Sequence, residues 1–196
     1  MRVNSLRVLI RSLTLIALII PAILLHSHAE AAASEPPVEG SMIKFVASDP
    51  PVPVPDTPFI GPRGETIKLA DYAGRMVLLN FWATWCAPCI RELPSLEALS
   101  QSIDDDRFTV QLVSIDRGGE AIYGPFLKKL GITGITSASD PKGALLRKLK
   151  APGIPITLLI SPDGLIVGRL IGDAEWNSPA AESLIKFYLT QGTSRS

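Results

Sequence analysis

After residue 55, segments with the hydrophobic pattern of a strand take turns along the chain with segments that have the pattern of a helix. The run Met76 to Ala83 is almost wholly apolar, which predicts a strand buried on both faces. Leucines then recur at helical spacing and predict a helix from about Ala87 to Ser102 with one apolar stripe. A second apolar run predicts another buried strand from Phe108 to Ile115.

The remaining patterns complete the order of a single α/β domain. They predict a short N-terminal hairpin, two internal helices with a short edge strand between them, a strand hairpin turned by Asp-Gly, and a last helix that Ser178 caps. These elements cover Phe59–Ile60 with Thr66–Leu69, Ala121–Leu130, Ser137–Ser139, Gly143–Leu149, Ile156–Ser161 with Leu165–Ile171, and Pro179 to about Thr190. The order predicts a central mixed sheet flanked by helices.

The N-terminus has the pattern of an export signal. Three arginines precede the apolar run Leu13–Leu25, and small residues near Ala29 suit cleavage. The run is shorter than the roughly 20 residues of a comfortable membrane span. Residues 1–30 are therefore expected to be a cleaved signal peptide or, alternatively, a membrane anchor. Both place the body in the periplasm, soluble or tethered to the inner membrane.

Residues 31–55 are rich in proline and poor in periodic hydrophobic pattern. Such a segment is expected to be extended and semi-rigid, so it is interpreted as a linker. The domain proper is then expected at residues 56–191.

Charge and composition exclude two classes of partner. The 19 basic residues balance the 19 acidic ones without a basic cluster on the body, so nucleic acid is not expected to bind. The only histidines, His26 and His28, lie in the leader, and the chain has two cysteines. A zinc or iron–sulfur site on the body would lack its usual ligands, so no metal is expected.

Both cysteines belong to one motif, Cys86-Ala87-Pro88-Cys89, placed where the predicted strand stops and the helix starts. The positive end of a helix stabilises a thiolate, which favours Cys86 as a nucleophile and leaves Cys89 to close a disulfide behind it. As a purely structural disulfide the pair would close a loop of about four residues and contribute only roughly 2 kcal/mol. A redox role explains the spacing better; an inert pair and a metal site remain as alternatives.

The motif and its context resemble the thioredoxin superfamily, and more closely its TlpA/ResA branch. The resemblance rests on Phe81–Cys89, on Glu92 with Pro94, and on Gly153–Thr157, while Gly172–Trp176 looks like TlpA rather than ResA. It covers roughly residues 56 to 190. It implies a thioredoxin-like fold with an N-terminal hairpin extension, and a thiol:disulfide oxidoreductase whose only redox group is the Cys86–Cys89 pair.

The resemblance also implies roles for residues around the cysteines. Glu92, one helical turn after Cys89, is expected to take the proton of that thiol; the alternative is a solvent-exposed helix glutamate. Asn80 stands where cytoplasmic thioredoxins hold a buried acid, and an amide cannot take the proton, which strengthens the case for Glu92. The alternative for Asn80 is an ordinary hydrogen-bonded strand residue.

Client binding is expected at residues on both sides of the sulfurs. Pro155 is expected to follow a cis peptide bond and to leave Ile154 free to pair with an extended client segment. Trp85 is expected to be half-buried beside Cys86 and, with Ala87 and Pro88, to form part of the docking surface. Two other tryptophans are interpreted as structural, Trp82 as core and Trp176 as a cap on the last helix.

The predicted reaction is the reduction of client protein disulfides. No histidine lies between the cysteines, and its absence favours a reductant over an oxidant. The resemblance implies clients in copper delivery or in cytochrome oxidase and cytochrome c assembly, and electrons from a membrane thiol-transfer protein. The protein is separately expected to be a monomer. The alternatives are a disulfide oxidase or isomerase, a thiol peroxidase, and a module that holds copper on its cysteines.

Overall fold

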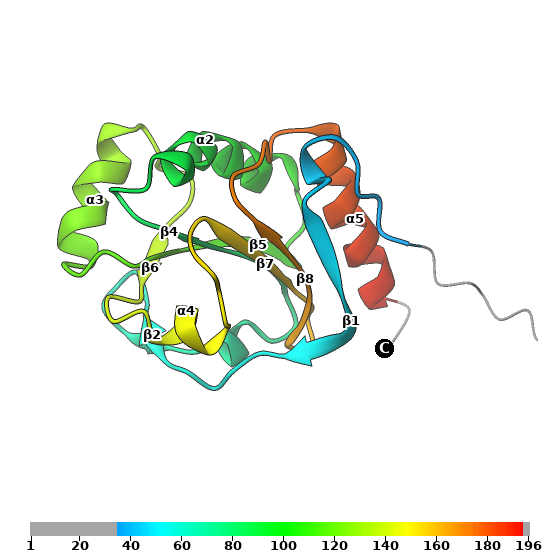
Figure 1. The fold of residues 1–196 in the computed structure, drawn as a ribbon, viewed down its shortest axis with the longest axis horizontal. Coiled ribbons are helices and arrows are strands. Elements are labelled where there is room, and N and C mark those ends of the chain that lie inside the picture. Colours follow the sequence, from blue (N-terminus) through cyan, green and yellow to red (C-terminus); the bar gives the residue numbers. More distant parts are fainter. Residues whose placement is uncertain (1–34, 194–196) are drawn as a thin grey trace, which may run out of the picture. The chain divides into compact units, whose positions relative to one another are not determined.

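A computed structural model describes residues 35–193, and a mixed sheet of eight strands is at its centre (Figure 1). The strands follow the order β1-β8-β7-β4-β5-β6-β2-β3 across the sheet. Their bounds are β1 Phe45–Pro53, β2 Phe59–Ile60, β3 Thr66–Ile67, β4 Met76–Trp82, β5 Phe108–Ser114, β6 Ser137–Ser139, β7 Ile156–Ile160 and β8 Leu165–Ile171. The helices are α2 Ala87–Ser102, α3 Glu120–Lys129, α4 Ala144–Lys148 and α5 Pro179–Thr193, with short 3-10 turns at Gly40–Met42 and Leu69–Tyr72.

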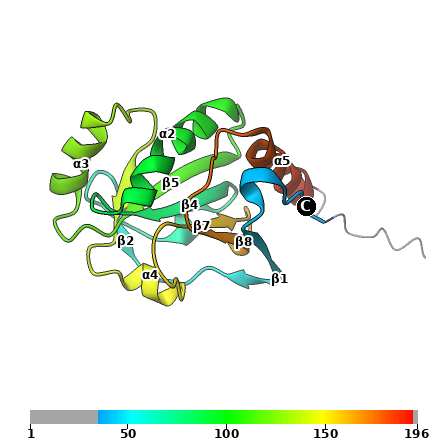
Figure 2. The same ribbon diagram turned by 45° about the horizontal axis from the view of Figure 1, so that its top comes forward.

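Two apolar layers enclose the sheet, and β4 contributes to both. Its even-numbered apolar residues, such as Leu78 and Trp82, pack with α2, α3 and α5. Its odd-numbered ones, such as Leu79 and Phe81, pack with α4 on the other face. Figures 1 and 2 show the three longer helices on one side of the sheet and α4 on the other. Because side chains alternate along a strand, an unbroken apolar run fills both layers, each large side chain contributing roughly 1.5–3 kcal/mol.

Strand direction brings the functional segments to one edge of the sheet. β4, β5 and β6 run parallel, so their carboxyl ends and the loops that follow share that edge. β7 runs antiparallel to β4 and pairs Ile156 with Phe81. The start of β7, directly after Pro155, therefore lies beside the end of β4, which leads into the cysteine motif.

The predicted linker at residues 31–55 is wrong for its second half. Residues 45–53 form β1, which pairs antiparallel with β8 at the edge of the sheet, and the compact unit already begins at Pro36. An edge strand needs hydrogen bonds on only one side, so prolines are tolerated there. Phe45 is buried against Gly168 of β8, where a Cβ atom would lie 2.1 Å from the ring. The sequence pattern alone does not reveal this packing.

The rest of the predicted α/β architecture is confirmed, including the hairpin extension, in which β2 pairs antiparallel with β3. The prediction that Ser137–Ser139 is an edge strand is wrong, because β6 lies between β5 and β2.

Trp82 is fully buried, as expected of a core residue. Across residues 35–193 no helix combines the length and apolar character that a membrane span requires. The predicted leader at residues 1–30 lies outside the described residues.

Candidate functional site: a dithiol at the start of α2

Cys86 and Cys89 are joined by a disulfide at the N-terminus of α2, with their Cα atoms 5.3 Å apart. Cys86 is the N-cap residue, and its Sγ accepts a hydrogen bond from the backbone N–H of Cys89 at 3.3 Å. Free N–H groups and the helix dipole give this end of α2 a partial positive charge, which favours a thiolate on Cys86 in the reduced protein. Cys86 keeps 6% of its surface exposed and Cys89 none, so only Cys86 offers surface to a client.

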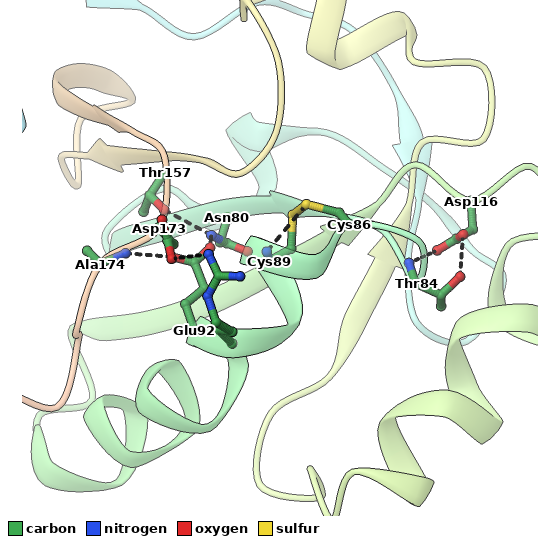
Figure 3. Close-up of a disulfide and its surroundings, with 10 residues drawn as sticks. Asn80, Thr84, Cys86, Cys89, Glu92, Asp116, Thr157, Asp173 and Ala174 are labelled. Atoms are coloured by element: carbon green, nitrogen blue, oxygen red, sulfur yellow. Dashed lines mark hydrogen bonds and ion pairs between the residues drawn. A yellow bond between two sulfur atoms is a disulfide. The ribbon is translucent and has the colours of Figure 1, made fainter.

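Glu92 lies one helical turn beyond Cys89 and points into the protein, where only 2% of it is exposed (Figure 3). Its Oε1 accepts from the side-chain amide of Asn80 at 2.8 Å. Its Oε2 accepts from the backbone N–H of Ala174 at 3.2 Å and from the indole N–H of Trp176 at 3.1 Å. The alternative of a solvent-exposed helix glutamate is therefore wrong.

Burial changes the acidity of this carboxyl group. Loss of water raises the pKa of Glu92 from 4.5 to about 7, although the hydrogen bonds from Asn80, Trp176 and Ala174 oppose the rise by favouring the charged form. Asp173 nearby adds a smaller rise. A carboxyl group with a pKa near neutral can both take and return a proton at physiological pH, as a general acid–base group must.

Asn80 connects Glu92 to the sheet. The amide also donates to Thr157 Oγ1 on β7 at 2.9 Å, so the prediction of a hydrogen-bonded strand residue is confirmed. Its Oδ1 is buried and has no hydrogen-bond partner within the described part of the chain. The site thus contains one buried acceptor that a thiol or a water molecule can use.

Trp176 is bound to α2 through both of its N–H groups. Its indole N–H donates to Glu92, and its backbone N–H donates to Ser95 Oγ at 3.1 Å. Ser95 Oγ in turn donates to the Glu92 carbonyl oxygen at 2.8 Å. The interpretation of Trp176 as only a cap on the last helix is incomplete, because this fully buried side chain orients Glu92. Beside it, Arg91 pairs with Asp173 at 2.9 Å.

A second network holds the loop that precedes Cys86. Asp116, at the end of β5, accepts from the backbone N–H of Thr84 at 3.0 Å and from its hydroxyl at 2.8 Å. It also accepts from Ser114 Oγ at 2.8 Å. Figure 3 shows this network and Glu92 on opposite sides of the disulfide. The loop between β4 and α2 is therefore fixed to the neighbouring strand.

The residues predicted to bind a client lie at the same edge, although their roles stay predictions. The bond between Ile154 and Pro155 is cis, as expected, and Pro155 is buried at the start of β7. Ala87 is exposed and Pro88 partly so. Trp85 is 67% exposed, so the expectation that it is half-buried is wrong. Most of its surface therefore faces solvent.

Sequence reasoning missed Ala174 and Asp116 as parts of the site. Ala174 acts through its backbone N–H, which carries no residue-specific signal. Asp116 comes directly after an apolar strand, a position at which a polar residue often lies near a site, and that signal was available. Within residues 35–193, no group of three or more His, Cys, Asp or Glu residues could hold a metal ion.

Comparison with known proteins assigns this site to a family. The model of the AhpC/TSA family matches residues 51–169. The thiol-disulfide oxidoreductase ResA of Oceanobacillus iheyensis is 34% identical over 102 residues, which cover 52% of each chain. The chain spans about half to two thirds of the length of the curated relatives it matches.

Solved structures match over more of their length. A Chlorobium tepidum protein assigned as thiol:disulfide interchange protein DsbE is 30% identical with a TM-score of 0.57, over 71% of this chain and 95% of that one. The exposed lipoprotein thioredoxin Etrx1 of Streptococcus pneumoniae is 27% identical with a TM-score of 0.56, over 69% of this chain and 99% of that one. These likenesses support a ResA-like dithiol site, while the special likeness to TlpA stays a prediction.

Proposed function

We propose that this chain, which belongs to the AhpC/TSA family, is a thiol:disulfide oxidoreductase that reduces disulfides of exported client proteins. One observation carries the proposal: three groups follow one another along the start of α2 in the order that the reaction needs. Cys86 lies at the N-terminus of the helix and keeps some exposed surface, Cys89 is buried, and Glu92 is buried with a pKa of about 7.

In the first step, the Cys86 thiolate of the reduced protein attacks one sulfur of a client disulfide. The client S–S bond breaks, and its second sulfur leaves as a thiolate, so a mixed disulfide joins Cys86 to the client. The positive end of α2 stabilises the attacking thiolate. Because Cys89 has no exposed surface, it does not compete for the client.

In the second step, Cys89 loses its proton and attacks Cys86. Glu92 accepts that proton directly or through water, and the Oδ1 of Asn80, which has no partner within the described residues, is a buried acceptor on the residue bonded to Glu92. The client sulfur leaves and the Cys86–Cys89 disulfide forms. Two electrons have then passed to the client, which leaves as a dithiol.

The Ala-Pro pair between the cysteines supports reduction rather than oxidation of the client disulfide, and the family resemblance supports the choice of partners. We propose that the clients belong to copper delivery or to cytochrome oxidase and cytochrome c assembly, and that a membrane thiol-transfer protein returns the protein to its dithiol form. The basic and apolar leader supports placement outside the cytoplasmic membrane, either soluble after cleavage or anchored.

Trapping the client tests the proposal. Replacing Cys89→Ser removes the attack that resolves the mixed disulfide, so the exported protein should accumulate as a covalent adduct with its client, which reducing agent releases. The double variant Cys86→Ser, Cys89→Ser is the control and should form no adduct. An equilibrium potential near about −270 mV supports a reductant, whereas one near about −120 mV would contradict that direction.

A thiol peroxidase is the second candidate, because the β2–β3 hairpin extends the core as in that class. Such an enzyme would consume hydrogen peroxide through Cys86. Purified protein that turns over peroxide faster than it reduces a protein disulfide would favour this candidate.

A further inference from the structure

An open groove lies on the side of Cys86 opposite Glu92. It has a volume of about 570 Å³, and its walls come from the loops after β5 and β6 together with Trp85. The carboxyl ends of parallel strands meet at this edge, a usual place for a binding crevice in an α/β sheet. Trp85, which lines the groove, directly precedes Cys86, so the groove begins one residue from the attacking cysteine.

The groove carries uncompensated positive charge. Arg117 and Lys142, one on each wall, are exposed, and neither forms an ion pair with any residue of the described range. The carboxylate in the groove, Asp116, is buried and occupied by hydrogen bonds from Thr84 and Ser114. The groove therefore offers two free cations and no free carboxylate.

Asp140, which precedes the second wall, is satisfied in the same way. It is buried and accepts the backbone N–H groups of Ala144 and Leu146 at 2.8 and 3.0 Å. Glu120, the exposed carboxylate at the start of α3, does not line the groove, so Arg117 and Lys142 are the exposed charged side chains among the residues that do.

Exposed apolar side chains line the same groove. Trp85 is 67% exposed and Ile122, at the start of α3, is 50% exposed. Large apolar side chains left in water beside a reactive group mark contact surfaces, and tryptophan is enriched among residues that dominate binding energy. The surface therefore suits a partner segment that combines an apolar residue with negative charges.

We propose that this groove binds the client segment next to the target cysteine, and that it selects segments carrying Asp or Glu. This inference rests on the proposed function and specifies its substrate class. Arg117 and Lys142 attract the acidic segment, while Trp85 and Ile122 cover its apolar part. Exposed charges of this kind act mainly on the rate of encounter, and salt screens them.

The test compares two disulfide peptides that differ only in flanking Asp and Glu or Asn and Gln. The reduced wild-type protein should reduce the acidic peptide about three- to tenfold faster at low salt, and 0.5 M salt should remove most of this preference. The variant Arg117→Glu, Lys142→Glu should lose or reverse it. The matched control Lys128→Glu, Lys129→Glu makes the same charge change on two exposed residues at the other end of α3 and should keep it.

Hydroxyethyl disulfide, which is neutral and too small to fill the groove, separates the two proposals. The wild type and the Lys128→Glu, Lys129→Glu control should reduce it at similar rates, and each protein's peptide rates are divided by its own rate with this reagent. If these two proteins do, yet the wild type reduces both peptides equally, the groove assignment is overturned and the proposed function stands. If the wild type reduces no disulfide at all, both are overturned. The wild type could instead form a dimer that the Arg117→Glu, Lys142→Glu variant does not form, and reduce both peptides at equal rates. That result would show that the groove binds a second copy of the chain, and it would overturn the client assignment.

Discussion

The two flanks of the Cys86–Cys89 disulfide differ in almost every physical property. On one flank, Glu92 is 2% exposed and accepts hydrogen bonds from three donors, one on β4 and two in the segment between β8 and α5. On the other flank, Trp85 is 67% exposed and lines the same groove as Arg117 and Lys142, which form no ion pair within residues 35–193. The buried flank is made of groups held by hydrogen bonds away from water, whereas the open flank combines the Asp116–Thr84 hydrogen bonds with large side chains that stay exposed.

This difference matches the two tasks of a dithiol enzyme. Proton transfer needs a group whose position and pKa are fixed, which burial and hydrogen bonds provide. Recognition of varied protein segments needs exposed side chains that can adapt to each client. Substitutions on the buried flank should therefore change chemistry and stability, and those on the open flank should change partner choice alone.

The largest loss of activity is expected from replacing Cys86, the nucleophile that lies between the two flanks. Cys86→Ser should reduce disulfide reduction to the uncatalysed background, because a serine hydroxyl does not replace a thiolate. The fold should persist, since the short disulfide contributes only roughly 2 kcal/mol. The measurement is reduction of hydroxyethyl disulfide and of a protein disulfide. Residual turnover in this variant would contradict the assignment of Cys86.

On the buried flank, Glu92→Gln should slow the resolving step by roughly 10²–10⁴-fold, the usual contribution of a general acid–base group. Stopped-flow decay of a preformed mixed disulfide measures this step and should lose its inflection near pH 7. Glu182→Gln, a partly exposed glutamate paired with Lys186, is the control and should change neither. Identical kinetics for Glu92→Gln and wild type across pH would remove Glu92 from the mechanism.

Glu92 should also make stability depend on pH. Its pKa is about 7 in the folded protein and about 4.5 when exposed, so the folded state holds the proton more tightly. The resulting stabilisation is complete below pH 4.5 and is lost as the pH rises through 7, a decrease of up to roughly 3 kcal/mol in the free energy of unfolding. Urea unfolding of the oxidised protein at several pH values measures it. The same slope in Glu92→Gln would assign it to other groups.

Trp176→Phe tests whether the indole N–H of Trp176 helps to set the pKa of Glu92 on the buried flank. The indole N–H favours the charged form of Glu92, so its loss should raise the pKa of Glu92 further and move the pH midpoint of the resolving step upward. The lost hydrogen bond should also lower the free energy of unfolding by roughly 1–3 kcal/mol.

Trp82→Phe is the matched control for this variant. Trp82 is equally buried and donates to Ser137 rather than to Glu92, so its replacement should destabilise the protein without moving the midpoint. A midpoint that moves in both variants would mean that Trp176 has no special relation to Glu92.

The smallest change in stability is expected on the open flank. Trp85→Ala removes a side chain that is 67% exposed, so the free energy of unfolding should change by less than about 0.5 kcal/mol. Client reduction should nevertheless slow by roughly fivefold or more, as for an aromatic contact worth over 1 kcal/mol. Hydroxyethyl disulfide should react as before. A large loss of stability would show that the two flanks are not separate in function.

Local sequence patterns predicted most of the architecture. The apolar run of β4, the leucine spacing of α2 and the Asp-Gly turn before β8 are signals carried within a few residues. The cysteine motif likewise predicted a disulfide between Cys86 and Cys89 at the junction of a strand and a helix. The edge strand β1 was missed because its prolines are typical of a linker. Its pairing with β8 also depends on Gly168, which leaves room for Phe45 and lies more than a hundred residues away in the sequence.

The sequence by itself therefore determined the order of elements, the position of the dithiol at a helix N-terminus and the identity of Glu92 as a candidate acid. Only the tertiary structure decided that Glu92 is buried, that Trp176 and Asn80 hold it, and that Trp85 faces solvent beside two unpaired cations. The physical reason is distance along the chain. Periodicity and helix ends act over a few residues, whereas desolvation and hydrogen bonding depend on groups that meet only when the sheet has formed.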